Sequence, residues 1–298
     1  MSVFTLVLPD FLLIALGWVL LHKLKFSRDF FQNAERLVYF VLFPALLFHS
    51  ITQTPISIAS ASTLLQATVA AMGFGVALAW LAVPVLKPDP VDHASTAQCA
   101  FRFNTYIGLS IALSLGGTKG QTIMAIIVGF AVPISNMAAV HALARQNGGK
   151  ALKEMAKNPF IIATVLGLLV NLLGVPVPKP IDVVLGRLGT SAIAIGLLCV
   201  GATLSLRGGL AAGRLMSWMI VARLIVNPIG AIFIGWMLEL PPLERQILLL
   251  FCALPPSSTA HVLAARMGGN GPLTATIMSV STLLSALTIP FWLMISGH

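Results

Sequence analysis

The chain has 298 residues, of which 57% are hydrophobic and only 9% are charged. Soluble proteins carry about 25% charged residues, so the composition indicates an integral membrane protein whose surroundings are the lipid bilayer. The net charge of +9 comes from basic residues scattered over short links rather than from a tract, which excludes nucleic acid as a partner.

Ten apolar stretches follow one another along the sequence, each close to the roughly 20 residues that a helix needs to cross a bilayer. The first has no basic residues before it and no small-residue cleavage site after it, so we expect a retained span rather than a signal peptide. The sequence therefore predicts an all-α protein with ten transmembrane helices, at 3–22, 31–51, 62–86, 95–116, 120–143, 158–174, 181–205, 213–238, 243–268 and 271–296.

Basic residues are concentrated in the links after the odd-numbered stretches. The opposite links carry only Lys119, Lys179 and Arg245, with Arg187 at a border. Because basic links stay in the cytoplasm, both termini are predicted on the outer side of the cell (inner) membrane. The predicted cytoplasmic residues are Lys23, Lys25, Arg28, Lys87, Arg145, Lys150, Lys153, Lys157, Arg207, Arg214 and Arg266.

The two halves of the chain repeat each other at an offset close to 150 residues. Five stretches per half is an odd number, so the halves insert with opposite topology, as in many transporters. We predict a first five-helix repeat at 1–143, a cytoplasmic linker at 144–157 and an inverted second repeat at 158–298. The matching pairs are Pro9 with Pro159, Gly17 with Gly167, and Gly116-Gly117 with Gly268-Gly269.

Polar residues interrupt the fourth stretch between Phe101 and Ser110. Arg102, Asn104 and Thr105 stand where a simple spanning helix would carry Leu or Val. A charge at bilayer depth costs at least roughly 2.5 kcal/mol, so it is usually kept for function. We expect the helix to break here, with Asn104 and Thr105 bonding the freed backbone groups.

The corresponding part of the ninth stretch contains Pro255-Pro256, which removes two backbone donors and makes a continuous helix improbable. Ser257, Ser258 and Thr259 are suitable N-caps for a helix that resumes. The sequence thus predicts two broken, crossing helices, one per repeat. The alternative is a pair of kinked helices packed in a bundle.

Two arginines at the depth of the helix breaks favour the binding of an anion there. Arg102 and Arg223 each lie about ten residues into their stretches from the cytoplasmic side, roughly 10–15 Å deep at 1.5 Å per residue. Guanidinium binds carboxylate in a bidentate manner. The alternatives are snorkelling and a structural pair with a carbonyl. The predicted substrate-binding residues are Arg102, Asn104, Thr105, Arg223, Asn227, Pro255, Pro256, Ser257 and Ser258.

Three titratable residues are candidates for carrying a coupling proton or ion. Asp10 follows Pro9 in the first stretch and equally suits a kink near the interface. His49 and His261 titrate near neutrality, although a lone histidine in a span is more often a packing residue. Asn136 could line a cavity or bond a neighbouring helix.

The sequence holds no metal-ligand cluster, no nucleophilic triad and no phosphate-binding loop, so we expect neither an enzyme nor a cofactor or metal site. Cys99, Cys199 and Cys252 all fall inside apolar stretches and predict packing residues rather than a disulfide.

The motifs Phe43-Pro44-Ala45-Leu46-Leu47-Phe48, Asn104-Thr105 with Gly108, and Leu254-Pro255 occur in this order over nearly the whole length. In them the chain resembles a prokaryotic member of the auxin efflux carrier family, which includes plant PIN-type carriers and bacterial malonate carriers. The resemblance implies a fold shared with bile acid/sodium symporters, an elevator-like movement of a crossover-bearing part against a scaffold, and a homodimer. It also implies that Asn104 and the crossover at Pro255-Pro256 line the site.

Two departures from the PIN pattern, Phe103 in place of proline and a missing long central loop, favour a small organic acid over auxin. The functional hypothesis is a secondary active transporter of a malonate-like mono- or dicarboxylate, with a proton or sodium as coupling ion. A membrane sensor or scaffold derived from a transporter, and a uniporter or channel for organic acids, are the alternatives.

Overall fold

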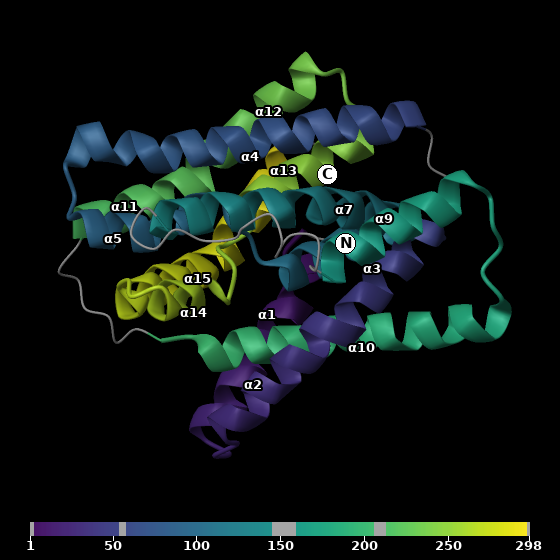
Figure 1. Ribbon diagram of the computed structural model, residues 1–298, viewed down its shortest axis with the longest axis horizontal. Coiled ribbons are helices and arrows are strands. Elements are labelled where there is room, and N and C mark those ends of the chain that lie inside the picture. The colour runs from purple at the N-terminus through teal and green to yellow at the C-terminus, as the bar shows by residue number, and fades with distance from the viewer. Residues whose placement is uncertain (1–2, 54–57, 145–158, 206–212, 297–298) are drawn as a thin grey trace.

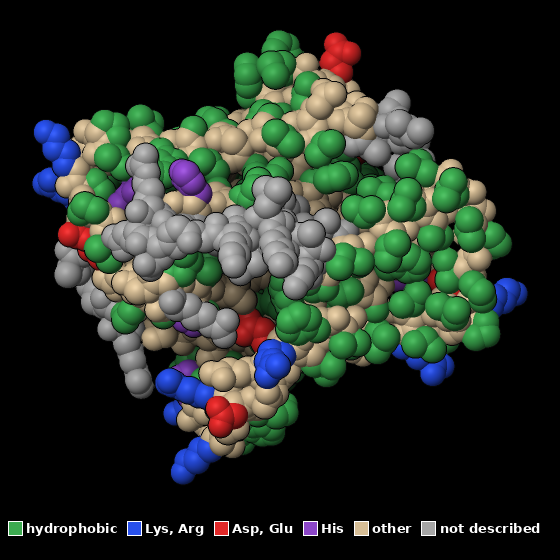
Figure 2. Space-filling model, viewed as in Figure 1, with side chains coloured by type: hydrophobic (Ala, Val, Ile, Leu, Met, Phe, Trp, Pro, Cys, Tyr) green, Lys and Arg blue, Asp and Glu red, His purple; other side chains and the backbone are tan. Residues whose placement is uncertain are grey.

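The computed structural model describes residues 3–53, 58–144, 159–205 and 213–296, and every element in these ranges is a helix. Within them, six helical stretches are long and apolar enough to cross a membrane, and two shorter helices are also apolar. Hydrophobic side chains cover much of the molecular surface, with Lys and Arg mainly near its edges (Figure 2). The protein is therefore a multi-pass membrane protein. The count of ten crossings stays a prediction, and the linker residues 145–157 lie outside the described ranges.

One group of helices, called the scaffold unit here, packs around α10 (Figure 1). Its tightest contact is between α1 and α10, where Gly17 lies against the carbonyl of Leu198 and Gly201 lies against the carbonyl of Ile14. Small residues allow such close backbone approach in membrane helices. The scaffold unit consists of α1 (Val3–His22), α2 (Arg28–Leu37), η1 (Val38–Leu42), α3 (Phe43–Thr52), α9 (Pro159–Leu172) and α10 (Lys179–Thr203).

The other group, called the crossover unit, packs α7 against α4 and α13, and α12 against α4 and α13. Figure 1 shows α4 and α12 on the side of the molecule opposite to α2 and α10. The crossover unit consists of α4 (Ile58–Leu86), α5 (Pro90–Thr96), α6 (Gln98–Phe101), α7 (Thr105–Ala144), α11 (Gly213–Val221), η2 (Ala222–Val226), α12 (Asn227–Met237), α13 (Pro242–Ala253), α14 (Ala260–Arg266) and α15 (Gly271–Ile295).

The long helix α7 is a hairpin of two helices. Its direction changes at Gly116 and Gly117, and Gly117 has a φ of 58°, which L side chains rarely adopt. Gly108 consequently lies beside Met124, and Gly120 lies against the carbonyl of Ala112.

Two π-helical turns, η1 and η2, each come just before a proline, Pro44 and Pro228. Proline lacks an N–H and its ring clashes with the carbonyl four residues earlier, which a wider turn relieves. In both turns the residue before the proline donates to the carbonyl five residues back, Phe43 to Val38 and Asn227 to Ala222. The η2 turn matters below because it carries Arg223.

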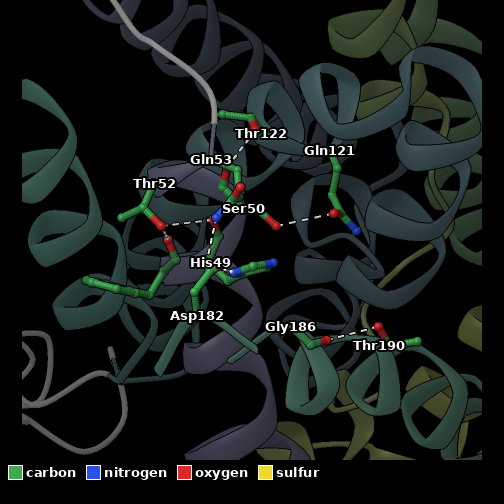
Figure 3. A network of polar contacts seen from close by, with 10 residues as sticks. His49, Ser50, Thr52, Gln53, Gln121, Thr122, Asp182, Gly186 and Thr190 are labelled. Carbon is green, nitrogen blue, oxygen red and sulfur yellow. Dashed lines mark hydrogen bonds and ion pairs between the residues drawn. The ribbon is translucent and has the colours of Figure 1, made fainter. Parts of the chain in front are cut away.

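Side-chain hydrogen bonds connect the scaffold unit with the crossover unit. The Ser110 hydroxyl on α7 donates to Asp10 Oδ1 on α1 at 2.5 Å. Ser50 on α3 donates to Gln121 Oε1 at 3.3 Å, and the Thr122 hydroxyl donates to the Ser50 carbonyl at 2.7 Å (Figure 3).

Candidate functional site

Two broken helices cross, as the sequence predicts, within the crossover unit. The helix α6 ends at Phe101, and Arg102 takes an extended conformation with φ −72° and ψ 150°. The helix α13 ends at Ala253, and Leu254 is extended in the same way, with φ −61° and ψ 143°. The two breaks are bonded to each other, because the Asn104 N–H donates to the Pro255 carbonyl at 2.9 Å.

Asn104 caps the helix that resumes after the first break. Its Oδ1 accepts hydrogen bonds from the N–H groups of Tyr106 at 3.1 Å and Ile107 at 3.2 Å. These are two of the four N–H groups that a helix start leaves without a partner. The predicted backbone-bonding role of Asn104 is confirmed, whereas the Thr105 side chain makes no cap bond to any described residue. The Nδ2 amide of Asn104 is buried and has no hydrogen-bond partner.

At the second break the predicted hydroxyl bond to the backbone comes from Ser257, whose Oγ accepts from the Thr259 N–H at 3.4 Å. Thr259 is the N-cap of α14, but it lies in the helical region with φ −89° and ψ −1°, and no side-chain cap bond forms. A cap side chain reaches back over the helix only from an extended backbone. The Thr259 hydroxyl instead lies 3.0 Å from the Ser257 hydroxyl and accepts from Arg102.

Arg223 and Asn227 hold the ends of the helices that stop at the breaks. Arg223 Nε donates to the Leu254 carbonyl at 2.6 Å, and its Nη2 donates to the Phe251 carbonyl at 2.9 Å. Asn227 Nδ2 donates to the Ala100 carbonyl at 2.7 Å. These residues are expected from sequence to bind substrate, but Nε and Nη2 of Arg223 and Nδ2 of Asn227 donate to backbone carbonyls. For Arg223, the structure follows the alternative of a structural pair with a carbonyl.

A cavity of about 80 Å³ lies beside the crossing. Both units contribute to its wall, since Tyr39 and Phe160 come from the scaffold unit and the remaining residues come from the crossover unit. The rings of Tyr39 and Phe160 are themselves packed, with centroids 4.9 Å apart. The lining residues are Tyr39, Arg102, Phe103, Asn104, Thr105, Tyr106, Val132, Ser135, Asn136, Phe160, Ser257, Ser258 and Thr259.

The cavity contains five of the predicted binding residues, Arg102, Asn104, Thr105, Ser257 and Ser258. Pro255 and Pro256 shape the break but do not line the cavity, and Arg223 and Asn227 do not line it either. Sequence reasoning missed Tyr39 and Phe160, because aromatic residues in apolar stretches carry no signal of their own.

Among the described residues, Arg102 is the cation that lines this cavity, and its hydrogen-bond partners are all neutral. It donates to Gln98 Oε1 at 2.9 Å, to Asn136 Oδ1 at 3.1 Å and to the Thr259 hydroxyl at 3.4 Å. Gln98 is held in turn by bonds to the carbonyls of Ser95 and Ala260. The described part of the lining contains no Asp or Glu. The arrangement presents a positive charge, an unpaired amide and several hydroxyls to whatever enters.

The three coupling candidates lie outside this lining. Asp10 is 4% exposed, and its Oδ2 has no partner. His261 Nδ1 lies 2.9 Å from the Ser258 carbonyl, within the crossover unit.

His49 belongs to a polar group between α3 and α10 (Figure 3). Its Nδ1 lies 3.0 Å from Asp182 Oδ1, close enough for an ion pair, although the angle is not that of a hydrogen bond. Gln53 Nε2 donates to the same oxygen at 2.6 Å. His49 and its partner Asp182 both lie in the scaffold unit. Among the described residues, no group of three or more His, Cys, Asp or Glu is placed to hold a metal.

Comparison with known proteins gives the family. A family model described as "Membrane transport protein" matches residues 2–148 and 140–293. An "Uncharacterized transporter" of Methanothermobacter thermautotrophicus is 24% identical over 296 residues, which cover 96% of each chain. A "Putative malonate transporter" of Rhizobium meliloti is 24% identical over 95% of this chain and 92% of that protein. The "Uncharacterized transporter YfdV" of Escherichia coli is 24% identical over 97% of this chain and 96% of its own length.

These matches span both halves of the chain and all the residues that form the crossing and its cavity. They confirm the resemblance that the motifs indicate. The chain belongs to the membrane transport protein family of auxin efflux carriers, so it is a membrane transporter.

Proposed function

We propose that the protein is a secondary active transporter of a small organic anion. The observation that carries this proposal is the Arg102 guanidinium, which faces the cavity and bonds only to neutral oxygens. A carboxylate in the cavity would supply the missing negative charge and would accept two parallel hydrogen bonds from the guanidinium. The unpaired Nδ2 of Asn104 is a further donor for a carboxylate oxygen.

The size of the cavity favours a small substrate. Drug-sized ligands occupy pockets of roughly 300–1,000 Å³, and this cavity has about 80 Å³. Such a space suits a mono- or dicarboxylate of few atoms better than a large aromatic acid. The relative from Rhizobium meliloti whose name refers to malonate makes malonate the first compound to test.

We infer a membrane topology of ten spans in two inverted five-helix repeats, 1–143 and 158–298. Two pairs of structural features separated by 151 positions support it. Asn104 and Pro255 both follow the end of a half-helix, and Gly117 and Gly268 are both turn residues with positive φ, 58° and 74°. The basic links of the sequence then place both termini outside the cell membrane.

In this topology, the contacts between the units and the cavity lie toward opposite membrane faces. The pairs Asp10–Ser110 and Ser50–Gln121 lie toward the outer ends of their helices. Asn136 and Phe160 flank the cavity near the cytoplasmic link. An elevator-type step would break the outer contacts and move the crossover unit along the scaffold unit, carrying the cavity outward.

Counterflow in proteoliposomes tests the transport mechanism. Vesicles loaded with unlabelled malonate should accumulate labelled malonate transiently and saturably, as a carrier does. A sensor or scaffold would show no uptake, and a channel would show a single-channel current without counterflow. Uptake that is unchanged in both Arg102→Ala and Asn104→Ala would remove the cavity as the substrate site.

A further inference from the structure

The half-helix α13 ends in carbonyl groups that its own chain leaves without donors. The N–H that would bond the Phe251 carbonyl belongs to residue 255, and the one for the Cys252 carbonyl belongs to residue 256, but both are proline. Helix C-termini carry partial negative charge. In transporters with discontinuous helices, such carbonyls are the groups that coordinate a coupling sodium ion.

In this protein the side chain of Arg223 lies against the carbonyl groups at the end of α13. The Arg223 guanidinium bonds the Leu254 and Phe251 carbonyls at 2.6 and 2.9 Å, and only 2% of the residue is exposed. Arg223 makes no ion pair with any described Asp or Glu. Within the described part of the chain, its charge is therefore balanced by carbonyl dipoles, as the charge of a bound metal cation would be.

The helical segment that contains Arg223 also contacts the first broken helix, at the end of α6. Asn227, four residues later, bonds the Ala100 carbonyl at the end of α6. The π-helical turn η2 contains Arg223 and ends just before Asn227, and the Trp292 indole fixes that turn by donating to the Leu224 carbonyl at 2.8 Å. The position of the guanidinium is therefore set by packing within the crossover unit.

We propose that Arg223 is a resident cation that replaces an inorganic coupling cation at the crossing, so that the carrier works without sodium. A guanidinium stays charged at every physiological pH and cannot dissociate from the chain. Sodium therefore cannot compete for the carbonyls of Phe251 and Leu254 while Arg223 is present. Arg223 acts as a positioning residue that holds the second arm of the crossing behind the cavity. Removing its charge should expose the same carbonyls to a monovalent metal cation.

The test compares wild type, Arg223→Ala, Arg223→Lys and the control Arg187→Ala, which changes an exposed arginine of α10. Thermal unfolding of each purified protein is followed in sodium chloride and in choline chloride of equal concentration. Wild type, Arg187→Ala and Arg223→Lys should have the same Tm in both salts, because their charge is retained. Arg223→Ala should have a lower Tm in choline, and sodium should raise it with the logarithm of its concentration.

A wild-type Tm that rises in sodium but not in choline would overturn the proposal, as would an Arg223→Ala protein without a sodium-specific rise. If Arg223→Ala does not fold, Arg223→Gln is measured in its place, and the wild-type result still decides whether a sodium site exists. A merely structural role for Arg223 would lower the Tm equally in both salts.

Uptake into proteoliposomes gives a second readout, which rests on the proposed transport function. Wild-type uptake of malonate should be the same with external sodium or choline. Uptake by Arg223→Ala should be lost in choline and partly restored by sodium. If no tested anion is taken up by the wild type, the proposed function fails, while the unfolding data still decide on the resident cation.

Discussion

The backbone N–H of Asn104 and the carbonyl of Pro255 are joined by a 2.9 Å hydrogen bond across 151 residues of sequence. The bond ties the two helix breaks together, one from each half of the chain. Its donor residue also caps α7 with its side-chain oxygen and offers a buried, unpaired amide at the cavity. Asn104 therefore combines a structural role with a binding role, and substitutions can separate the two.

The first prediction concerns the two roles of Asn104. Asn104→Ala should lower the free energy of unfolding by about 1 kcal/mol through loss of the cap, and it should abolish malonate uptake. Asn104→Asp keeps a capping oxygen but replaces the Nδ2 donor with negative charge, so stability should be retained and uptake lost. Chemical unfolding and proteoliposome uptake measure the two effects. Asn33→Ala, an exposed position on α2, is the control. Full uptake by Asn104→Asp would contradict the binding role.

The second prediction concerns Arg102. Arg102→Ala should weaken the apparent affinity for the anion by about 10- to 100-fold, because a hydrogen bond to a charged group contributes roughly 1.5–3 kcal/mol. Arg102→Lys should recover part of the affinity, since it keeps the charge but loses the planar pair of donors. Concentration-dependent uptake gives these values, with Arg187→Ala as the exposed control. Equal loss in the alanine and lysine variants would show that charge is not what the substrate recognises.

The third prediction concerns the contact between Asp10 and Ser110. Ser110→Ala removes the hydrogen bond that the buried Asp10 carboxylate accepts and should destabilise the protein by about 1–3 kcal/mol. Asp10→Asn removes the buried charge itself and should destabilise it less. Unfolding of the two variants in one detergent makes the comparison.

The Asp10→Asn variant also tests whether Asp10 carries a coupling proton. If Asp10 carries the coupling proton, wild-type uptake should respond to a pH gradient and Asp10→Asn uptake should not. Asn33→Ala, at an exposed position of α2 without a titratable group, is the control. An Asp10→Asn protein with the full response to the gradient would exclude this role for Asp10.

The fourth prediction concerns the packing of the scaffold unit. A Cβ atom at Gly201 would overlap the Ile14 carbonyl and approach the Trp18 backbone, so Gly201→Ala should cost about 1–3 kcal/mol through overpacking. Gly73→Ala is the matched control, because nothing lies within 4 Å of its added Cβ. That variant should be neutral or gain up to about 1 kcal/mol of helix propensity. Equal thermal stability of both variants would contradict the close packing of α1 and α10.

The sequence determined the membrane class, the helix breaks and the capping role of Asn104, because each follows from local chemistry. A low fraction of charged residues selects the bilayer, and Pro255-Pro256 removes the donors that a continuous helix needs. The fourth apolar stretch has no proline at its break, so the Asn104 side chain is expected to bond the backbone N–H groups that the break leaves free. These inferences needed no knowledge of which helices are neighbours.

Only the tertiary structure decided which side chains share the cavity and which serve the backbone. Arg102 and Arg223 look equivalent in sequence, at similar depth and with similar charge. In the fold, Arg102 faces the cavity beside Asn136 and Thr259, whereas the π-helical turn before Pro228 directs Arg223 to the carbonyls of α13. Tyr39 and Phe160 enter the cavity wall only because the scaffold unit packs there. The physical reason is that the role of a buried cation depends on the dipoles around it, and helices far apart in sequence supply those dipoles.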